Sequence, residues 1–283
     1  MAIKDILLTL TSYPDPTSDA SIEQALSLCA ALHAHVTGLT FEAEFRMPAT
    51  TSSLSNMLLD VPLMMAEEKE KSEANAKHVV ETFRDTAARL GVPHAAIVEK
   101  CVTFRIADAI AEHSHLHDLT MIPLQAGYSV EQWYAETTIF GSGRPTIIVP
   151  AVKQSKTFAL NTVAVAWDFT RSAARALSDA LPILQMAKHV RLVTIANDKK
   201  ISDAHSPAEL AQNLLRHGVG IELDIVDGKG RGAGEALAAY CRENKVDLLV
   251  MGGYGHSRLR EFVMGGATRS MLDGPPVPVF LSH

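Results

Sequence analysis

The chain has 283 residues, a length that fits about two domains of roughly 150 residues each. Hydrophobic residues make up 47% and charged residues 20%, with 17 glycines and 13 prolines, which excludes fibrous, collagen-like and largely disordered proteins. The net charge is −6 and the basic residues are dispersed, so we predict that nucleic acid is not a partner.

No apolar run approaches the ~18 residues that a membrane-spanning helix needs. Asp5 lies where a signal peptide would begin its apolar stretch, so we predict a soluble, cytoplasmic protein with no membrane partner. The three cysteines, Cys29, Cys101 and Cys241, lie far apart and in no CxxC spacing. This pattern favours a reducing compartment over a disulfide framework or a zinc site.

In the first half, five short apolar stretches predict strands joined by amphipathic segments. These strands are expected near residues 5–10, 35–40, 94–102, 119–122 and 146–149. An insertion at residues 42–69, containing Pro, Ser and Met, predicts a flap. An exposed flap could line a lipophilic pocket or a partner surface, whereas the commoner outcome for apolar residues is that the flap folds back over its own core.

The second half repeats this alternation of strands and helices. Strands are expected at residues 162–167, 190–196, 221–226, 247–251 and 277–281, and helices at 172–187, 207–215, 235–243 and from 266. Strands that alternate with helices form parallel sheets with right-handed connections. The predicted fold class is therefore α/β and Rossmann-like, with two tandem open five-stranded, mainly parallel sheets flanked by helices.

Short matches relate the two halves in the same order. Residues 118–122 (DLTMI) echo 247–251 (DLLVM), and 145–149 (PTIIV) echo 276–280 (PVPVF), at a nearly constant offset. Collinear matches of this kind indicate a tandem duplication.

The most informative segment follows the strand expected at residues 247–251. The strand runs directly into Gly252 and Gly255, and a second pair, Gly265 and Gly266, opens a short helix. Ligands of open α/β sheets bind at the carboxyl ends of strands. Glycine lets the backbone approach a phosphate closely and tolerates positive φ, and a helix N-terminus binds anions. Two glycine elements therefore predict an anion site.

The spacing Gly252-x2-Gly255-x9-Gly265 resembles the ATP-binding signature of the universal stress protein family, Gly-x2-Gly-x9-Gly-Ser/Thr. The strand order, the duplication and the final Pro-Val-Pro-Val strand are also similar to that family across essentially the whole chain. The resemblance implies two domains, residues 1–152 and 153–283, that pair through their last strands like an internal dimer. It further implies a bound adenine nucleotide, ATP with or without Mg²⁺, and a role in stress resistance or signalling.

The resemblance also assigns the phosphate contacts. Gly252, Gly255, Gly265 and the amide of Gly266 are expected to hold the phosphates and the ribose. Gly266 replaces the Ser/Thr of the signature, and the loss of that hydroxyl is expected to cost on the order of 1 kcal/mol. Thr268, in the first turn of the helix, is the candidate to compensate.

Four further residues follow from the same resemblance. Asp168 lies where the family places an acid near the adenine, and Ile195 lies where an apolar side chain meets the base. His256 and Ser257 follow the first glycine pair and could donate to phosphate oxygens. The alternatives are a glycine loop that only packs, a helix N-cap at Asp168 and a solvated loop histidine at His256.

The first half departs from the motif. Pro123 aligns with Gly252, Ala126 aligns with Gly255, and Thr11 replaces the strand-end acid. This half is expected to have lost nucleotide binding and to serve as a dimer mate or to use residues 42–69 for another ligand.

Two weaker patterns compete with this interpretation. Gly228, Gly230 and Ala233, with Asp247 about 20 residues on, fit a loose dinucleotide fingerprint, but it follows the third strand of its half instead of the first. The segment His113-Ser-His-Leu-His117 could bind a metal, although a solvated turn is favoured because no acid or cysteine completes the ligand set. Neither a P-loop nor a GxSxG elbow occurs.

Together these patterns predict an ATP-binding stress-response protein that acts as a nucleotide-dependent sensor or protective factor, with one site in the C-terminal domain. A non-nucleotide module that uses the flap for a lipophilic ligand or partner is one alternative, and a weak ATPase is another. No catalytic or metal-ligating residue is assigned. The sequence names no protein partner and leaves a further homodimer open.

Overall fold

The computed structural model describes residues 2–46, 61–125, 127, 129–154, 157–196, 206–228, 230–253 and 266–283. We call residues 2–154 the N-terminal half and residues 157–283 the C-terminal half. In chain order, the described elements of the N-terminal half are β1 (Asp5–Thr9), α1 (Asp19–Leu32), β2 (His35–Glu44), α3 (Val61–Arg89), β3 (His94–Val102), the 3₁₀ helix η1 (Thr103–Arg105), α4 (Ile106–Ser114), β4 (Leu119–Pro123), α5 (Val130–Gly141) and β5 (Thr146–Val149). Those of the C-terminal half are β6 (Thr162–Ala166), α6 (Arg171–Leu184), β7 (His189–Ala196), α7 (Pro207–Arg216), β8 (Ile221–Asp227), α8 (Ala233–Glu243), β9 (Leu248–Gly252), α9 (Gly266–Asp273) and β10 (Val279–Ser282).

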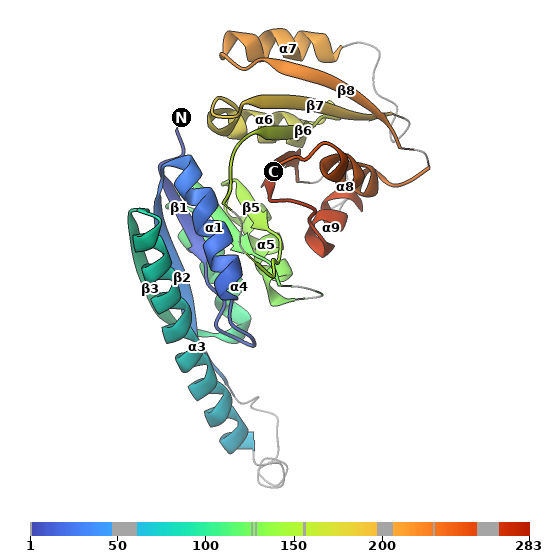
Figure 1. Ribbon diagram of the computed structural model, residues 1–283. Helices are drawn as coiled ribbons and strands as arrows, with labels where there is room; N and C mark the ends of the chain where they lie inside the picture. The colour runs from blue at the N-terminus through green and yellow to red at the C-terminus, as the bar shows by residue number, and fades with distance from the viewer. Residues whose placement is uncertain are drawn as a thin grey trace.

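The described strands form one sheet in the order β3-β2-β1-β4-β5-β10-β9-β6-β7-β8 (Figure 1). Pairing is parallel within each half, whereas β5 and β10 pair antiparallel, with Phe280 opposite Ile147. The predicted α/β class is confirmed. The two sheets expected from the sequence are joined, through the last strand of each half, into a single ten-stranded sheet.

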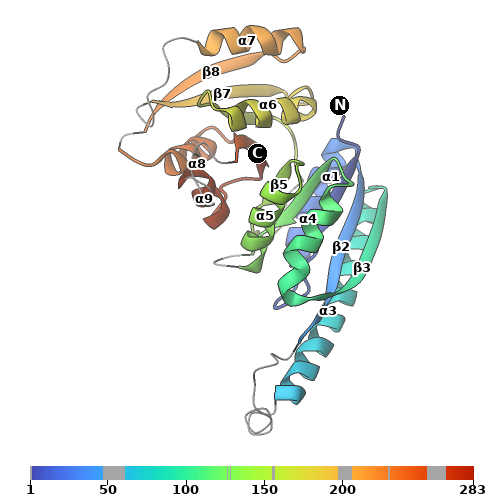
Figure 2. The same cartoon turned by 180° about the vertical axis from the view of Figure 1, so that it is seen from behind.

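Helices cover both faces of this sheet (Figures 1 and 2). One apolar core lies between the sheet and α1, α3, α6 and α7, and the other lies beneath α4, α5, α8 and α9. Because a core lies on each side of the sheet, the central strands are buried on both faces. Every residue of β4 is buried, and so are four of the five residues of β9. In the part of the chain that is described, no helix is both long enough and apolar enough to cross a membrane.

The repeated Asp-Leu segments make the same contact in both halves. Oδ2 of Asp118 accepts the backbone N–H groups of Lys4 and Asp5 at 2.9 and 3.2 Å, at the start of β1. Oδ2 of Asp247 accepts the two corresponding N–H groups at the start of β6, at 3.0 and 2.9 Å. The sequence repeat thus reflects a carboxylate that satisfies the first backbone donors of a central strand.

The predicted flap differs from the structure where it is described. Residues 47–60 lie outside the described residues, while residues 61–69 form the first turns of α3, a helix of 29 residues. Leu63 and Met64 are 60% and 58% exposed there. Figures 1 and 2 show this end of α3 extending beyond the sheet, so residues 61–69 do not fold back over the core.

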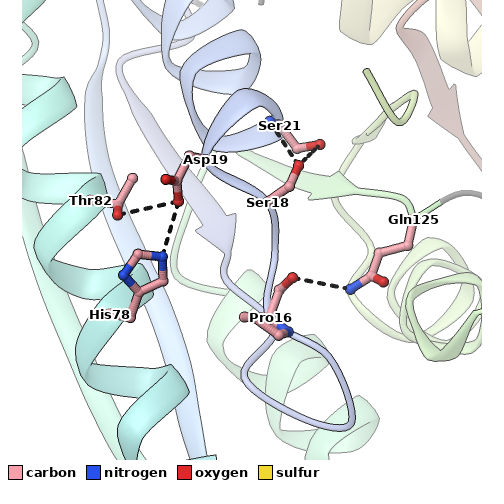
Figure 3. A network of polar contacts seen from close by, with 7 residues as sticks. All are labelled: Pro16, Ser18, Asp19, Ser21, His78, Thr82 and Gln125. Atoms are coloured by element: carbon pink, nitrogen blue, oxygen red, sulfur yellow. Dashed lines mark hydrogen bonds and ion pairs between the residues drawn. The ribbon is translucent and has the colours of Figure 1, made fainter. Parts of the chain in front are cut away.

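Side-chain hydrogen bonds attach α1 to its surroundings (Figure 3). The Ser18 hydroxyl caps α1 by accepting the N–H of Ser21 at 3.3 Å. Asp19, in the first turn, contacts Nε2 of His78 at 3.1 Å and accepts the Thr82 hydroxyl at 3.4 Å, both from α3. The contacts of Asp19 hold the start of α1 against α3.

Candidate functional site

A cavity of about 500 Å³ lies at the carboxyl ends of β6, β7 and β9. In the order β9-β6-β7, the strands β7 and β8 lie on one side of β6, and the next strand, β9, lies on its other side. The cavity lies at this reversal of strand order, which is the usual ligand position in open α/β folds. Its volume is in the range of small-molecule sites. Its walls are the strand ends and the first turns of α6, α8 and α9.

Three helices therefore begin at one cavity. The first backbone N–H groups of a helix have no partner within the helix and carry the positive end of its dipole. In α6, the side chain of Thr170 accepts the N–H of Ala173, whereas α8 begins at Gly232 without a side-chain cap. Gly266 is the first residue of α9 and also lines the cavity. The cavity is consequently rich in backbone donors suited to an anion.

The predicted site residues that are described all line this cavity: Asp168, Ile195, Gly252, Gly266 and Thr268. The remaining predicted residues, Gly255, His256, Ser257 and Gly265, lie outside the described residues. The structure thus brings together residues from β7, β9, α9 and the turn after β6, which are far apart in the sequence.

The structure gives Gly252 a packing role. A Cβ at this position would lie 2.5 Å from the carbonyl carbon of Ser172 and 2.6 Å from the amide nitrogen of Ala173, both in the backbone of α6. Gly252 is not among the glycines with positive φ. Its lack of a side chain therefore lets β9 approach α6. Gly266 differs, because a Cβ there would meet nothing within 4 Å.

Asp168 is held in a turn before α6. Its Oδ1 accepts the backbone N–H of Thr170 at 3.1 Å and the Thr170 hydroxyl at 2.6 Å. Thr170 is the N-cap of α6, so the alternative that Asp168 caps the helix is wrong. The turn fixes the carboxylate of Asp168 at the cavity wall.

Sequence reasoning missed several lining residues, among them Trp167, Ser172, Glu235 and Ser270. The indole Nε1 of Trp167 is buried without a hydrogen-bond partner. Trp167 directly follows β6, and Ser172 and Glu235 lie in the first turns of α6 and α8. Applying the strand-end rule to every strand of the second half, instead of to the glycine segment alone, would have found Trp167, Ser172 and Glu235.

The corresponding crevice of the N-terminal half is almost filled. A space of about 10 Å³ remains between Thr11, Phe41 and Tyr134. In the N-terminal half, Leu39 pairs with the last residue of β1, and Phe41 lies two residues further along β2. In the C-terminal half, Val193 pairs with the last residue of β6, and Ile195 lies two residues further along β7. The ring of Phe41 thus stands where the C-terminal half has the smaller side chain of Ile195. Tyr134 is buried at the same crevice, and this burial raises its pKa.

The two competing patterns do not assemble a site. Asp247 accepts backbone N–H groups at the amino end of β6, whereas a dinucleotide would bind at the carboxyl ends of the strands, so Asp247 lies too far away to contact it. The three histidines contact different groups: His113 contacts Glu99, His115 the carbonyl oxygen of Gly141, and His117 the carboxylate of Asp5. Over the described ranges, no three His, Cys, Asp or Glu side chains are arranged to hold a metal.

Comparison with known proteins relates this fold to one family. Residues 160–283 match the model of the Universal stress protein family. The universal stress protein Slr1230 of Synechocystis sp. is 24% identical over 249 residues, which are 81% of this chain and 78% of that protein. The crystal structure of a universal stress protein from Archaeoglobus fulgidus is similar with a TM-score of 0.67 at 16% identity, covering 98% of this chain and 95% of that chain. A putative universal stress protein from Pseudomonas aeruginosa has a TM-score of 0.57 at 14% identity, with 99% and 93% covered.

Proposed function

We propose that the chain is a tandem two-domain member of the universal stress protein family and that it binds ATP in the cavity of its C-terminal half. In this proposal the protein is a cytoplasmic, nucleotide-dependent sensor or protective factor of the stress response. The observation that carries it is the convergence of three helix N-termini on one cavity of about 500 Å³ beside Gly252 and Gly266. The pairing of β5 with β10 supports an internal dimer of the two domains.

The lining residues fit the parts of a nucleotide. Backbone donors at the starts of α8 and α9 suit phosphate oxygens. Trp167 and Ile195 provide apolar surface for the base, and Asp168 provides a carboxylate acceptor beside them. Glu235, in the first turn of α8, would supply an oxygen ligand to a Mg²⁺ bound with the phosphates, since Mg²⁺ in such sites needs only one or two carboxylates.

The test uses Gly266, where the fold tolerates a side chain. Gly266→Asp places a carboxylate at the anion site, while an acid at a helix N-terminus stabilises the helix by about 0.3–1 kcal/mol. We expect this variant to fold and to lose ATP binding in calorimetry, whereas Gly266→Asn, which has the same size without the charge, retains most of it. Mass spectrometry of small molecules released from the denatured wild-type protein should detect adenine nucleotide. Equal ATP affinity in the two variants would contradict the proposed phosphate position.

Restoring the hydroxyl of the family signature should strengthen binding. A Ser side chain at position 266 has open space and can donate to a phosphate oxygen, and a hydrogen bond to a charged group contributes about 1.5–3 kcal/mol. We expect Gly266→Ser to bind ATP about tenfold more tightly than the wild type. Gly266→Ala is the control for backbone effects and should show no gain in calorimetry.

Two other functions give different results in the same assays. A weak ATPase would release phosphate at a rate that falls in Gly266→Asp and persists in Gly266→Asn. A non-nucleotide binding module would carry no released nucleotide and give no heat with ATP in either the wild type or Gly266→Ser. That result would favour a ligand of the N-terminal half instead.

A further inference from the structure

Two helices of the candidate site, α8 and α9, lie side by side in direct contact (Figures 1 and 2). Gly234, in the first turn of α8, is buried against α9. A Cβ at this position would lie 2.5 Å from the Cβ of Ser270 and 2.8 Å from its Oγ, and 3.3 Å from the Cα of Ala267. The two helices can therefore approach this closely because residue 234 has no side chain.

This contact forms part of the wall of the cavity in the C-terminal half. Gly234 of α8 lines that cavity, and so do Ala267 and Ser270 of α9. The contact thus joins the beginnings of two helices whose first backbone N–H groups have no partner within the helix. A change in the distance between α8 and α9 therefore changes where these donors lie relative to each other.

The other glycines at these two helix starts do not have this role. A Cβ at Gly232, the N-cap of α8, or at Gly266, the first residue of α9, would meet nothing within 4 Å. Space for a side chain is therefore closed at Gly234 and open at its two neighbours in the cavity wall. Packing of α9 against α8 explains this difference.

The far end of α9 is fixed by contacts of its own. Met271 and Leu272 are 0% and 2% exposed and belong to an apolar core of the sheet. The side chain of Gln132, on α5, donates to the carbonyl oxygen of Leu272 at 3.0 Å. A methyl group added at Gly234 would meet the Cβ of Ser270, which no change of side-chain rotamer can move. Such a group would push the beginnings of the two helices apart.

From this arrangement we propose that Gly234 is a positioning residue of the anion site, an inference that rests on the proposed function. By admitting Ser270, Gly234 sets the distance between α8 and α9 at which the N–H groups of both helix starts bind the same phosphate chain. A helix N-terminus acts on an anion only within its first turn, so separating the two helices removes the hydrogen bonds of one of them.

Gly234→Ala tests this positioning by calorimetry on the full chain. The probes are ATP and inorganic pyrophosphate, which carries phosphates without the base. We expect the variant to bind both probes about tenfold more weakly than the wild type, because a hydrogen bond to a charged group is lost. Ala236→Gly exchanges the same two residue types at a buried position of α8 without adding an atom. It is the matched control for a weakened helix and should bind both probes like the wild type.

A second substitution removes the clash and serves as the rescue. Ser270→Gly deletes the two atoms that a Cβ at position 234 would approach most closely. In that background, Gly234→Ala should weaken binding of either probe less than about threefold, and this coupling identifies the contact between α8 and α9 as the cause. A loss of the same size in both backgrounds, or unchanged affinity in Gly234→Ala, overturns the proposal. Circular dichroism verifies the folding of each variant.

The pyrophosphate probe separates this inference from the proposed function. Pyrophosphate binding without ATP binding in the wild type contradicts the nucleotide assignment alone, since the variants still report the positioning through pyrophosphate. ATP binding without pyrophosphate binding at millimolar concentration means that the helix starts do not hold the phosphates, and it overturns the inference while ATP binding stands. Absence of binding by either probe overturns both.

Discussion

Gly252→Ala is expected to lower the free energy of unfolding by about 2–3 kcal/mol, although it adds only one methyl group. The added Cβ would lie about 2.5 Å from backbone atoms of Ser172 and Ala173, and a backbone cannot rotate away as a side chain can. The strand β9 and the start of α6 must therefore separate. Urea-induced unfolding, followed by circular dichroism, measures the difference.

Gly266→Ala is the matched control for this prediction. It makes the same chemical change in the same glycine segment, but its Cβ meets nothing within 4 Å. We expect a change of less than about 1 kcal/mol in either direction. Equal destabilisation of the two variants would show that the approach of β9 to α6 is not what requires Gly252. Because Gly252 supports packing, loss of ATP binding in its variants would not identify a phosphate contact.

Asp247→Ala is expected to cost about 3 kcal/mol of unfolding free energy. The substitution leaves two backbone N–H groups at the start of β6 without their charged acceptor, and hydrogen bonds to charged groups contribute about 1.5–3 kcal/mol each before solvent access reduces them. Asp118→Ala should cost a similar amount, since Asp118 makes the same pair of bonds to β1. Thermal and urea unfolding of both variants provide the comparison.

Asp247→Asn and Asp85→Ala are the controls for the carboxylate pair. Asn retains an oxygen acceptor without the charge, so it should cost roughly half as much as Ala. Asp85 is an exposed residue of α3, and its removal should cost nothing measurable. If Asp118→Ala were neutral while Asp247→Ala destabilised the protein, the carboxylate contact would contribute to stability in the C-terminal half but not in the N-terminal half, contrary to this prediction.

Much of the fold could be predicted because its signals are local. The strand expected at residues 94–102 is β3, and the strand expected at 221–226 is β8 with one further residue. The end of the insertion differs from the prediction for a physical reason: residues 61–69, expected as part of a flap, start a helix that continues through a charged segment. A helix that projects past the sheet needs no apolar stripe in its first turns, so periodicity does not reveal it.

The sequence by itself determined the α/β class, the duplication and the glycine segment at the end of one strand. Each is visible in short segments of a few residues, or in the comparison of two such segments, because strand patterns are set by backbone geometry and by burial on two faces of a sheet. Only the tertiary structure decided that α6, α8 and α9 begin at one cavity, and that Gly252 packs against α6. It alone showed that Phe41 and Tyr134 fill the other crevice and that Gly234 lets Ser270 of α9 approach α8. Each of these depends on packing between segments distant in the chain, which no local pattern encodes.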